Sequence, residues 1–289
     1  MKTIILISFL IPFFSQSQYF DYKFEEGNNY KLAEFRFWKP ESNKKYKGVL
    51  VLVPGYNYDG RNAISDTLWT KFAKNNNLII VALHFKDYEN LGKPEYRQAS
   101  KGSGKALLDA IKKYSEISSN RYFEELPLLL FGISAGGQFN YEFVCWKPEK
   151  VISFVVNKGG YYDTGIASSR THNVPGIFFI GENDKYYRNN MIKGIYSANR
   201  NLGAKWTLIV EKNTKHEFNN SKKMSLAYFD SILSQRISRN NELIYLDNNK
   251  ELYGDPNKKI ILQNKESENL LVWLPDKNIG NLWLKSLKK

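Results

Sequence analysis

The sequence Gly-x-Ser-x-Gly at residues 132–136 follows directly on a short apolar segment, residues 126–131. This segment is too short for a helix and has the length of a buried strand, whereas Phe139 and Phe143 recur at helical spacing just after the serine. Glycines suit the flanking positions because a Cβ there would collide with the strand or the helix. Strand, tight turn and helix in this order predict a nucleophile elbow, which lifts the hydroxyl of Ser134 above the edge of a sheet.

Other apolar segments of strand length alternate with amphipathic segments along the chain. Uniformly apolar segments are typical of strands that are covered on both faces. Such strands are expected at residues 49–53, 78–83, 128–131, 151–156, 177–180 and 206–210, and helices at 64–75, 103–114, 135–146, 190–201 and 221–234. Residues 32–38 instead alternate apolar and polar side chains, which predicts an antiparallel strand with one buried face. The whole pattern predicts a doubly wound, mostly parallel α/β sheet.

The two ends of the chain depart from this pattern. Residues 1–14 carry one positive charge and then an apolar run, and small residues follow, so we expect a signal peptide over residues 1–17 and an exported protein, periplasmic or extracellular. No later apolar stretch is long enough to cross a bilayer. The main domain is expected over residues 18–239. Residues 240–289 are too few to bury a core of their own and should form a small β/α extension packed on that domain.

Charge and composition limit the classes of partner and of cofactor that we expect. The formal net charge is +13, but the basic residues are scattered singly and in pairs, with no basic helix, so no nucleic-acid partner is expected. The single cysteine, Cys145, excludes an intrachain disulfide and is expected to be a small buried core residue. Neither a metal-ligand spacing of Cys and His nor a phosphate-binding loop occurs, so we expect no metal and no cofactor. The oligomeric state stays open.

A serine hydroxyl is a weak nucleophile at neutral pH, so Ser134 requires a base, and the base requires an orienting acid. After a nucleophile elbow the acid and then the base follow on loops at the carboxyl ends of later strands. Of the three histidines only His216 follows the last predicted buried strand. Beyond residues 177–180 the chain offers Glu182 and Asp184. We prefer Asp184, which has the shorter side chain and lies further out, and Glu182 stays open as the alternative.

Attack on an ester carbonyl would create an oxyanion, which requires preorganised hydrogen-bond donors. The backbone N–H of Ala135, directly after the nucleophile, is one candidate. The second is expected in the loop after the first buried parallel strand, at residues 53–57, where a glycine lets the backbone turn inward. The N–H of Tyr56 is the candidate there.

At these residues the chain resembles the α/β-hydrolase superfamily. Residues 132–139, Tyr96 with Ala99-Ser100, and Trp273-Leu274-Pro275 resemble secreted esterases akin to polyhydroxybutyrate depolymerases and feruloyl esterases, over roughly residues 30–285. The resemblance implies a serine esterase that acts through an acyl-enzyme, with Ser134, Asp184 and His216 as its triad and Tyr56 and Ala135 as its oxyanion hole.

The chain departs from these esterases in two ways. Pro54-Gly55 stands where they have His-Gly, and in this it resembles polyester hydrolases and cutinases instead. The disulfides of the extracellular depolymerases are absent, because the chain has one cysteine.

Tyrosines are frequent in the loops that should border the site, and their flat rings would suit an aromatic or carbohydrate-linked ester. The residues expected at the substrate cleft are Tyr58, Tyr88, Tyr161 and Tyr186, with Tyr56, Tyr162 and Tyr187 in the same loops. Two other functions stay open. A prolyl-oligopeptidase-like peptidase shares the elbow but usually carries a propeller or cap for which this chain has no room. A catalytically silent, polymer-binding protein could keep the same fold, although it would normally lack one member of the triad.

Overall fold

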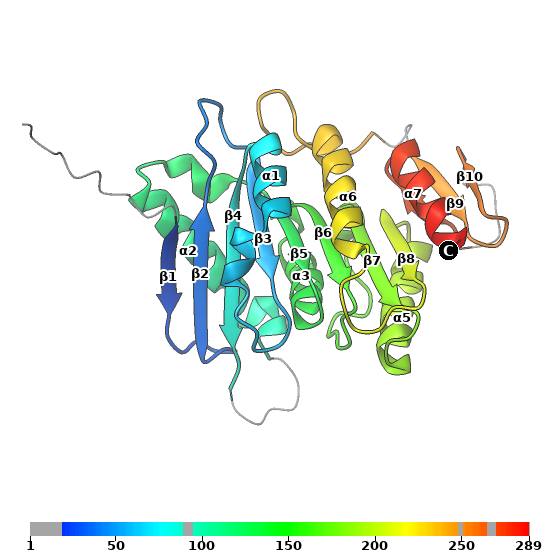
Figure 1. Ribbon diagram of the computed structural model, residues 1–289, viewed down its shortest axis with the longest axis horizontal. Helices are drawn as coiled ribbons and strands as arrows, with labels where there is room; N and C mark the ends of the chain where they lie inside the picture. Colours follow the sequence, from blue (N-terminus) through cyan, green and yellow to red (C-terminus); the bar gives the residue numbers. More distant parts are fainter. Residues whose placement is uncertain (1–18, 89–94, 248–250, 265–269, 289) are drawn as a thin grey trace, which may run out of the picture.

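The computed structural model describes residues 19–88, 95–247, 251–264 and 270–288, so the predicted signal peptide lies outside the described residues. A mixed sheet of eight strands, in the order β1-β2-β4-β3-β5-β6-β7-β8, forms its centre (Figure 1). The strands are β1 (Phe20–Phe24), β2 (Leu32–Trp38), β3 (Gly48–Val53), β4 (Leu78–Lys86), β5 (Leu128–Gly132), β6 (Val151–Asn157), β7 (Gly176–Gly181) and β8 (Trp206–Glu211). Strands β3 to β8 run parallel and β1 and β2 pair antiparallel, which confirms the predicted sheet.

Helices cover both faces of this sheet (Figure 1). On one face lie α2 (Ser103–Ile117), α3 (Ala135–Trp146) and α5 (Tyr186–Asn201), and on the other lie α1 (Thr67–Asn76) and α6 (Ser221–Arg236). Shorter helical segments are α4 (Ser169–His172) and the 3₁₀ turns Arg61–Ser65, Glu95–Arg97, Ala99–Lys101, Arg121–Glu125 and Pro148–Lys150. Each face buries its own hydrophobic cluster, as a doubly wound sheet requires.

Element boundaries differ from the expected ones where side chains cap or pair the backbone. The helix expected from residue 64 is divided at Asp66, whose carboxylate accepts a hydrogen bond from the N–H of Leu68 at 2.9 Å and so starts α1 afresh. Strand β1 was not predicted, although its aromatic side chains at Phe20, Tyr22 and Phe24 alternate with charged ones. In β2 the expected alternation is present, but Trp38 is also buried, on the opposite face of the sheet.

The C-terminal residues form a second, three-stranded sheet in the order β10-β9-β11, followed by a helix (Figure 1). Its elements are β9 (Leu252–Asp255), β10 (Ile260–Leu262), β11 (Val272–Leu274) and α7 (Lys277–Lys288). The hydroxyl of Thr207 in β8 donates to the carbonyl of Trp273 at 2.6 Å, and Trp273 and Trp283 share one hydrophobic cluster with Tyr228 of α6. The extension thus completes the core on one face of the main sheet.

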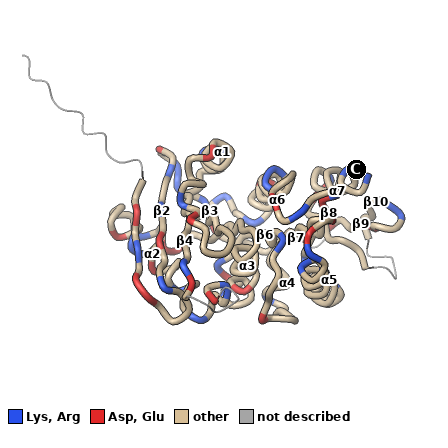
Figure 2. The backbone as a smooth tube through the Cα atoms, turned by 60° about the horizontal axis from the view of Figure 1, so that its bottom comes forward, with Lys and Arg blue, Asp and Glu red and all other residues tan. Residues whose placement is uncertain are grey.

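Lys and Arg are spread over helices, strands and loops and are interspersed with Asp and Glu (Figure 2). Cys145 in α3 is half-buried against the core, and burial raises the pKa of its thiol to about 12, so the thiol stays protonated at neutral pH. Across the described part of the chain, none of the helices combines the length and the apolar character that crossing a bilayer demands.

Candidate active site

The turn at Ser134 has the strained geometry of a nucleophile elbow. Strand β5 ends at Gly132, α3 begins at Ala135, and the serine between them has φ 56° and ψ −124°, a conformation that residues with a Cβ rarely adopt. A Cβ at Gly136 would collide with the carbonyl oxygen of Val53, and one at Gly132 would collide with the backbone of Gly136. The glycines therefore allow three backbone segments to meet at the serine.

The predicted base and acid lie on adjacent loops at the carboxyl ends of β7 and β8. Nδ1 of His216 lies 2.7 Å from Oδ2 of Asp184, whose side chain is only 1% exposed. Glu182, the alternative acid, is exposed, and its carboxylate accepts a hydrogen bond from the N–H of Asn213 at 2.9 Å. Of the two carboxylates, Asp184 therefore has the contact with the imidazole that an orienting acid requires.

Asp184 is held as a carboxylate. Burial alone would raise its pKa, but hydrogen bonds from His216 and from the N–H of Lys185 outweigh burial, and the pKa lies below its usual value of 3.8. The Arg188 guanidinium adds a further hydrogen bond at 3.0 Å. At neutral pH the anion can therefore hold the Nδ1 proton of His216 and stabilise an imidazolium.

A buried polar network, which the sequence did not reveal, joins the elbow to the loop that carries His216. The N–H of Ser134 donates to the carbonyl of Asn157 at 2.7 Å, and the next residue, Lys158, forms a fully buried ion pair with Glu211. Glu211 also accepts a hydrogen bond from the N–H of Ser221 at 2.8 Å. Since Glu211 ends β8 and Ser221 begins α6, this contact closes the base of the loop between them.

Ser134 and His216 are not hydrogen-bonded to each other. Among the described residues, neither Oγ of Ser134 nor Nε2 of His216 has a hydrogen-bond partner. Hydrogen bonds between catalytic groups are often long or unformed before substrate binds. The structure thus brings Asp184 and His216 together, and the described contacts include no hydrogen bond between His216 and Ser134.

The loop after β3 lies directly beside Ser134. A Cβ built on Gly55 would be 3.6 Å from Cβ of Ser134, so the loop backbone approaches the serine closely. The N–H of Ala135 stands at the first position of α3, where helical amides have no partner within the helix and the helix dipole is positive. Neither this amide nor that of Tyr56 donates to a described residue.

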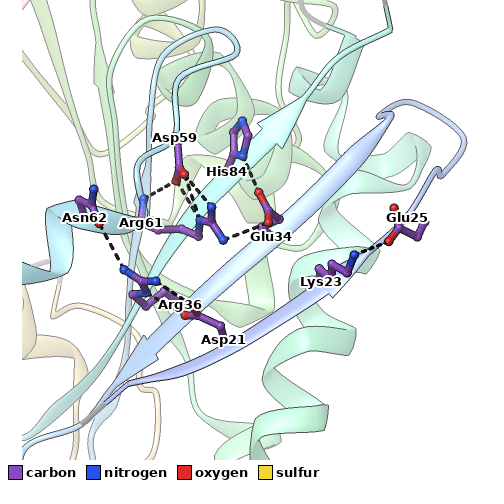
Figure 3. A network of polar contacts seen from close by, with 9 residues as sticks. All are labelled: Asp21, Lys23, Glu25, Glu34, Arg36, Asp59, Arg61, Asn62 and His84. Atoms are coloured by element: carbon purple, nitrogen blue, oxygen red, sulfur yellow. Dashed lines mark hydrogen bonds and ion pairs between the residues drawn. The ribbon is translucent and has the colours of Figure 1, made fainter. Parts of the chain in front are cut away.

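A polar network fixes the far end of this loop (Figure 3). The Arg61 guanidinium donates to Asp59 at 2.7 Å and to Glu34 of β2 at 3.0 Å, and Nδ1 of His84 lies 2.7 Å from Glu34. Hydrogen bonds from Arg61 lower the pKa of Asp59 to about 2. Glu34, Asp59 and His84 lie close enough to share a metal ion, but the Arg61 cation already hydrogen-bonds both carboxylates. The network therefore serves to anchor the loop to β2 and β4.

The remaining histidine lies apart from these loops. His172, at the end of α4, is buried, its Nε2 lies 2.9 Å from Oδ1 of Asn199, and its ring packs edge-on against Trp206. His216 is thus the histidine that the fold places at the carboxyl edge of β7 and β8.

A cavity of about 200 Å³ opens beside the elbow, and we call it the elbow cavity. Ile133 and Gly55 line it next to the serine, and Trp69, Phe131 and Phe218 supply aromatic walls. The rings of Phe131 and Phe218 are stacked with centroids 5.9 Å apart, and those of Trp69 and Phe131 are 4.5 Å apart. Tyr58, predicted at the cleft, also lines the cavity, whereas none of the three aromatic wall residues was predicted there.

The other predicted cleft tyrosines lie outside the lining of this cavity. Tyr161 contacts Tyr187 near the Asp184 loop, with ring centroids 5.9 Å apart, and Tyr186 is 81% exposed at the start of α5.

Two of the loop tyrosines differ from expectation because they support the fold. The hydroxyl of Tyr88 donates to the carbonyl of Gly27 and ties its loop to the β1–β2 turn. Tyr162 packs edge-on against Tyr141 of α3, with ring centroids 5.2 Å apart.

No protein-family model matches the chain, and no curated protein matches it. Solved structures of enzymes do share its fold. A ferulic acid esterase superposes with a TM-score of 0.56 at 12% identity, over 76% of this chain and 98% of its own. An S-formylglutathione hydrolase from Agrobacterium tumefaciens does so with 0.54 at 10% identity, over 75% and 94%. A poly(3-hydroxybutyrate) depolymerase from Bordetella parapertussis gives 0.53 at 16% identity, over 73% and 89%. The chain therefore has the α/β-hydrolase fold, which confirms the resemblance at the level of architecture.

Proposed function

We propose that this chain, with its α/β-hydrolase fold, is a serine hydrolase that cleaves carboxylic esters, with Ser134 as nucleophile, His216 as base and Asp184 as acid. One observation carries the proposal: a buried, ionised Asp184 lies 2.7 Å from Nδ1 of His216, at the sheet edge where Ser134 adopts a positive φ. Acid, base and nucleophile follow the order expected around a nucleophile elbow. The proposed reaction requires these protein groups and one water molecule.

In the proposed reaction, Oγ of Ser134 attacks the ester carbonyl carbon while Nε2 of His216 accepts the hydroxyl proton. The oxyanion of the tetrahedral intermediate accepts hydrogen bonds from the N–H groups of Ala135 and Tyr56. His216 then donates the proton to the alcohol oxygen as the bond between this oxygen and the carbonyl carbon breaks. The alcohol departs, and the acyl group stays bound to Ser134 as an acyl-enzyme. A water molecule then attacks the acyl-enzyme carbonyl while His216 accepts its proton. His216 returns this proton to Oγ of Ser134, and the carboxylic acid is released. Asp184 stays ionised throughout and stabilises the imidazolium.

We further propose that an aromatic or other compact apolar group of the substrate enters the elbow cavity. A dry cavity of about 150 Å³ holds one benzene ring, so about 200 Å³ has room for a ring with a short linker. Phe131 and Phe218 offer flat faces on which such a ring can stack.

Phe218→Ala should therefore lower kcat/KM for aryl-acyl esters about fivefold, because it removes one stacking face worth about 1 kcal/mol. Phe218 is 44% exposed, so the change should leave the core intact. Tyr186→Ala, at the exposed tyrosine outside the cavity, is the matched control. Steady-state kinetics on an aryl ester and an acetyl ester check the prediction. A larger loss in the Tyr186 variant would indicate that the aromatic ring of the substrate binds near Tyr186 and not in the elbow cavity.

A panel of p-nitrophenyl acyl esters, feruloyl esters and prolyl peptide amides tests the activity itself. We expect the esters to be hydrolysed and the peptide amides to be stable. Cleavage of the peptide amides at a higher kcat/KM would favour the peptidase, and binding of polymeric esters without turnover of any substrate would favour a catalytically silent protein.

We also propose that the protein is exported, to the periplasm or beyond the cell. The proposal rests on the apolar run within residues 1–17.

A further inference from the structure

A second and larger cavity, of about 410 Å³, is lined by residues of α6 and α7 and by residues near the carboxyl ends of β7 and β8. Its floor is apolar and is formed by Phe179 and Ile209 of the sheet. Met224 of α6 and Leu282 of α7 form facing walls. This interhelix cavity shares no lining residue with the elbow cavity, and its volume lies within the range of small-molecule sites, about 300–1,000 Å³.

The rim of the interhelix cavity carries an uncompensated positive charge. Lys212, Lys223 and Lys285 line it from three different elements, and all three are exposed. In the part of the chain that the structure describes, none of them has a carboxylate partner. The single carboxylate among the lining residues, Glu211, is already neutralised by the buried Lys158. An anion at the rim would therefore meet three cations and no free negative charge.

We propose that the interhelix cavity binds a single-chain aliphatic carboxylate, with its head at the three lysines and its chain over Phe179 and Ile209. The lysine rim and the apolar floor of the cavity match the head and the chain of such a ligand. Long-range attraction by the lysines favours an anion, and the apolar floor favours a chain without polar groups. The site lies behind the loop that carries His216 and does not depend on the proposed esterase activity.

Isothermal titration calorimetry with octanoate, decanoate and dodecanoate tests the proposal on the intact chain. Each methylene that enters the cavity should tighten binding about fourfold, with one acid bound per chain. Dodecyltrimethylammonium has the same chain and the opposite charge, and it should bind at least about tenfold more weakly. Equal binding of the cationic and anionic amphiphiles would overturn the proposal.

Two variants locate the bound acid. Ala227→Trp places a large ring in the half-buried wall of the cavity and should abolish dodecanoate binding. Lys223→Glu combined with Lys285→Glu changes only exposed side chains, so it should fold normally and weaken binding at least about tenfold. Phe218→Ala, in the elbow cavity, is the control and should bind dodecanoate as the unaltered chain does. Loss of binding in the Phe218 variant alone would assign the acid to the elbow cavity and overturn the proposal.

Discussion

Ser134→Ala is expected to lower kcat for ester hydrolysis by about six orders of magnitude, because it removes only the oxygen that attacks the carbonyl. The residual rate should come from the oxyanion hole and from substrate binding. Alanine has a Cβ like serine, so the strain at φ 56° is the same in both proteins and the fold should be unchanged. Turnover of a p-nitrophenyl ester measures the loss, and circular dichroism with thermal unfolding checks the fold. Activity within tenfold of the unaltered chain would exclude Ser134 as nucleophile.

Asp184→Asn is expected to lower kcat about ten-thousandfold, because a neutral amide cannot stabilise the imidazolium of His216 and favours the wrong tautomer. Glu182→Gln, two residues away, is the matched control and should cost less than tenfold, since Glu182 contacts the backbone of Asn213 and not the imidazole. Steady-state kinetics on one ester compares the two variants. The reverse ranking would assign the role of acid to Glu182.

Asp184→Asn should also change the dependence of stability on pH. The pKa of Asp184 is lower in the folded chain than its usual value of 3.8, so its ionisation stabilises the fold above that value. This contribution is lost as the pH falls through the lower, folded pKa. Denaturant titrations between about pH 2 and pH 6 should therefore show a smaller loss of stability on acidification in the Asn variant.

Much of the fold could be predicted because its signals are local. Buried parallel strands are continuous apolar runs, and the elbow needs glycines at a fixed spacing around Ser134. The position of His216 followed from chain order, since only this histidine comes after the last buried strand. Which of Glu182 and Asp184 faces it depends on the turn after β7, where the N–H of Asp184 donates to the carbonyl of Gly181 at 3.0 Å. The sequence alone does not indicate which of two carboxylates in one short loop faces the histidine.

The parts that were missed depend on contacts between distant segments. A lysine after a strand usually lies at the surface, and Lys158 is buried only because Glu211, from another strand, neutralises it. The elbow cavity takes its walls from Trp69 of α1, Phe131 of β5 and Phe218 in the loop before α6, so no window of sequence reveals it. The loop tyrosines were visible in the sequence, but packing assigns Tyr162 to the core.

Labelling with a fluorophosphonate, followed by peptide mapping by mass spectrometry, tests the proposed triad most directly. The reagent forms a covalent adduct with a serine only where a base activates the hydroxyl and an oxyanion hole receives the phosphonyl oxygen. We expect one adduct per chain, on Ser134, with parallel loss of ester hydrolysis and no adduct in Ser134→Ala. An adduct on another residue, or full ester hydrolysis in a chain that the reagent leaves unlabelled, would contradict the proposed mechanism.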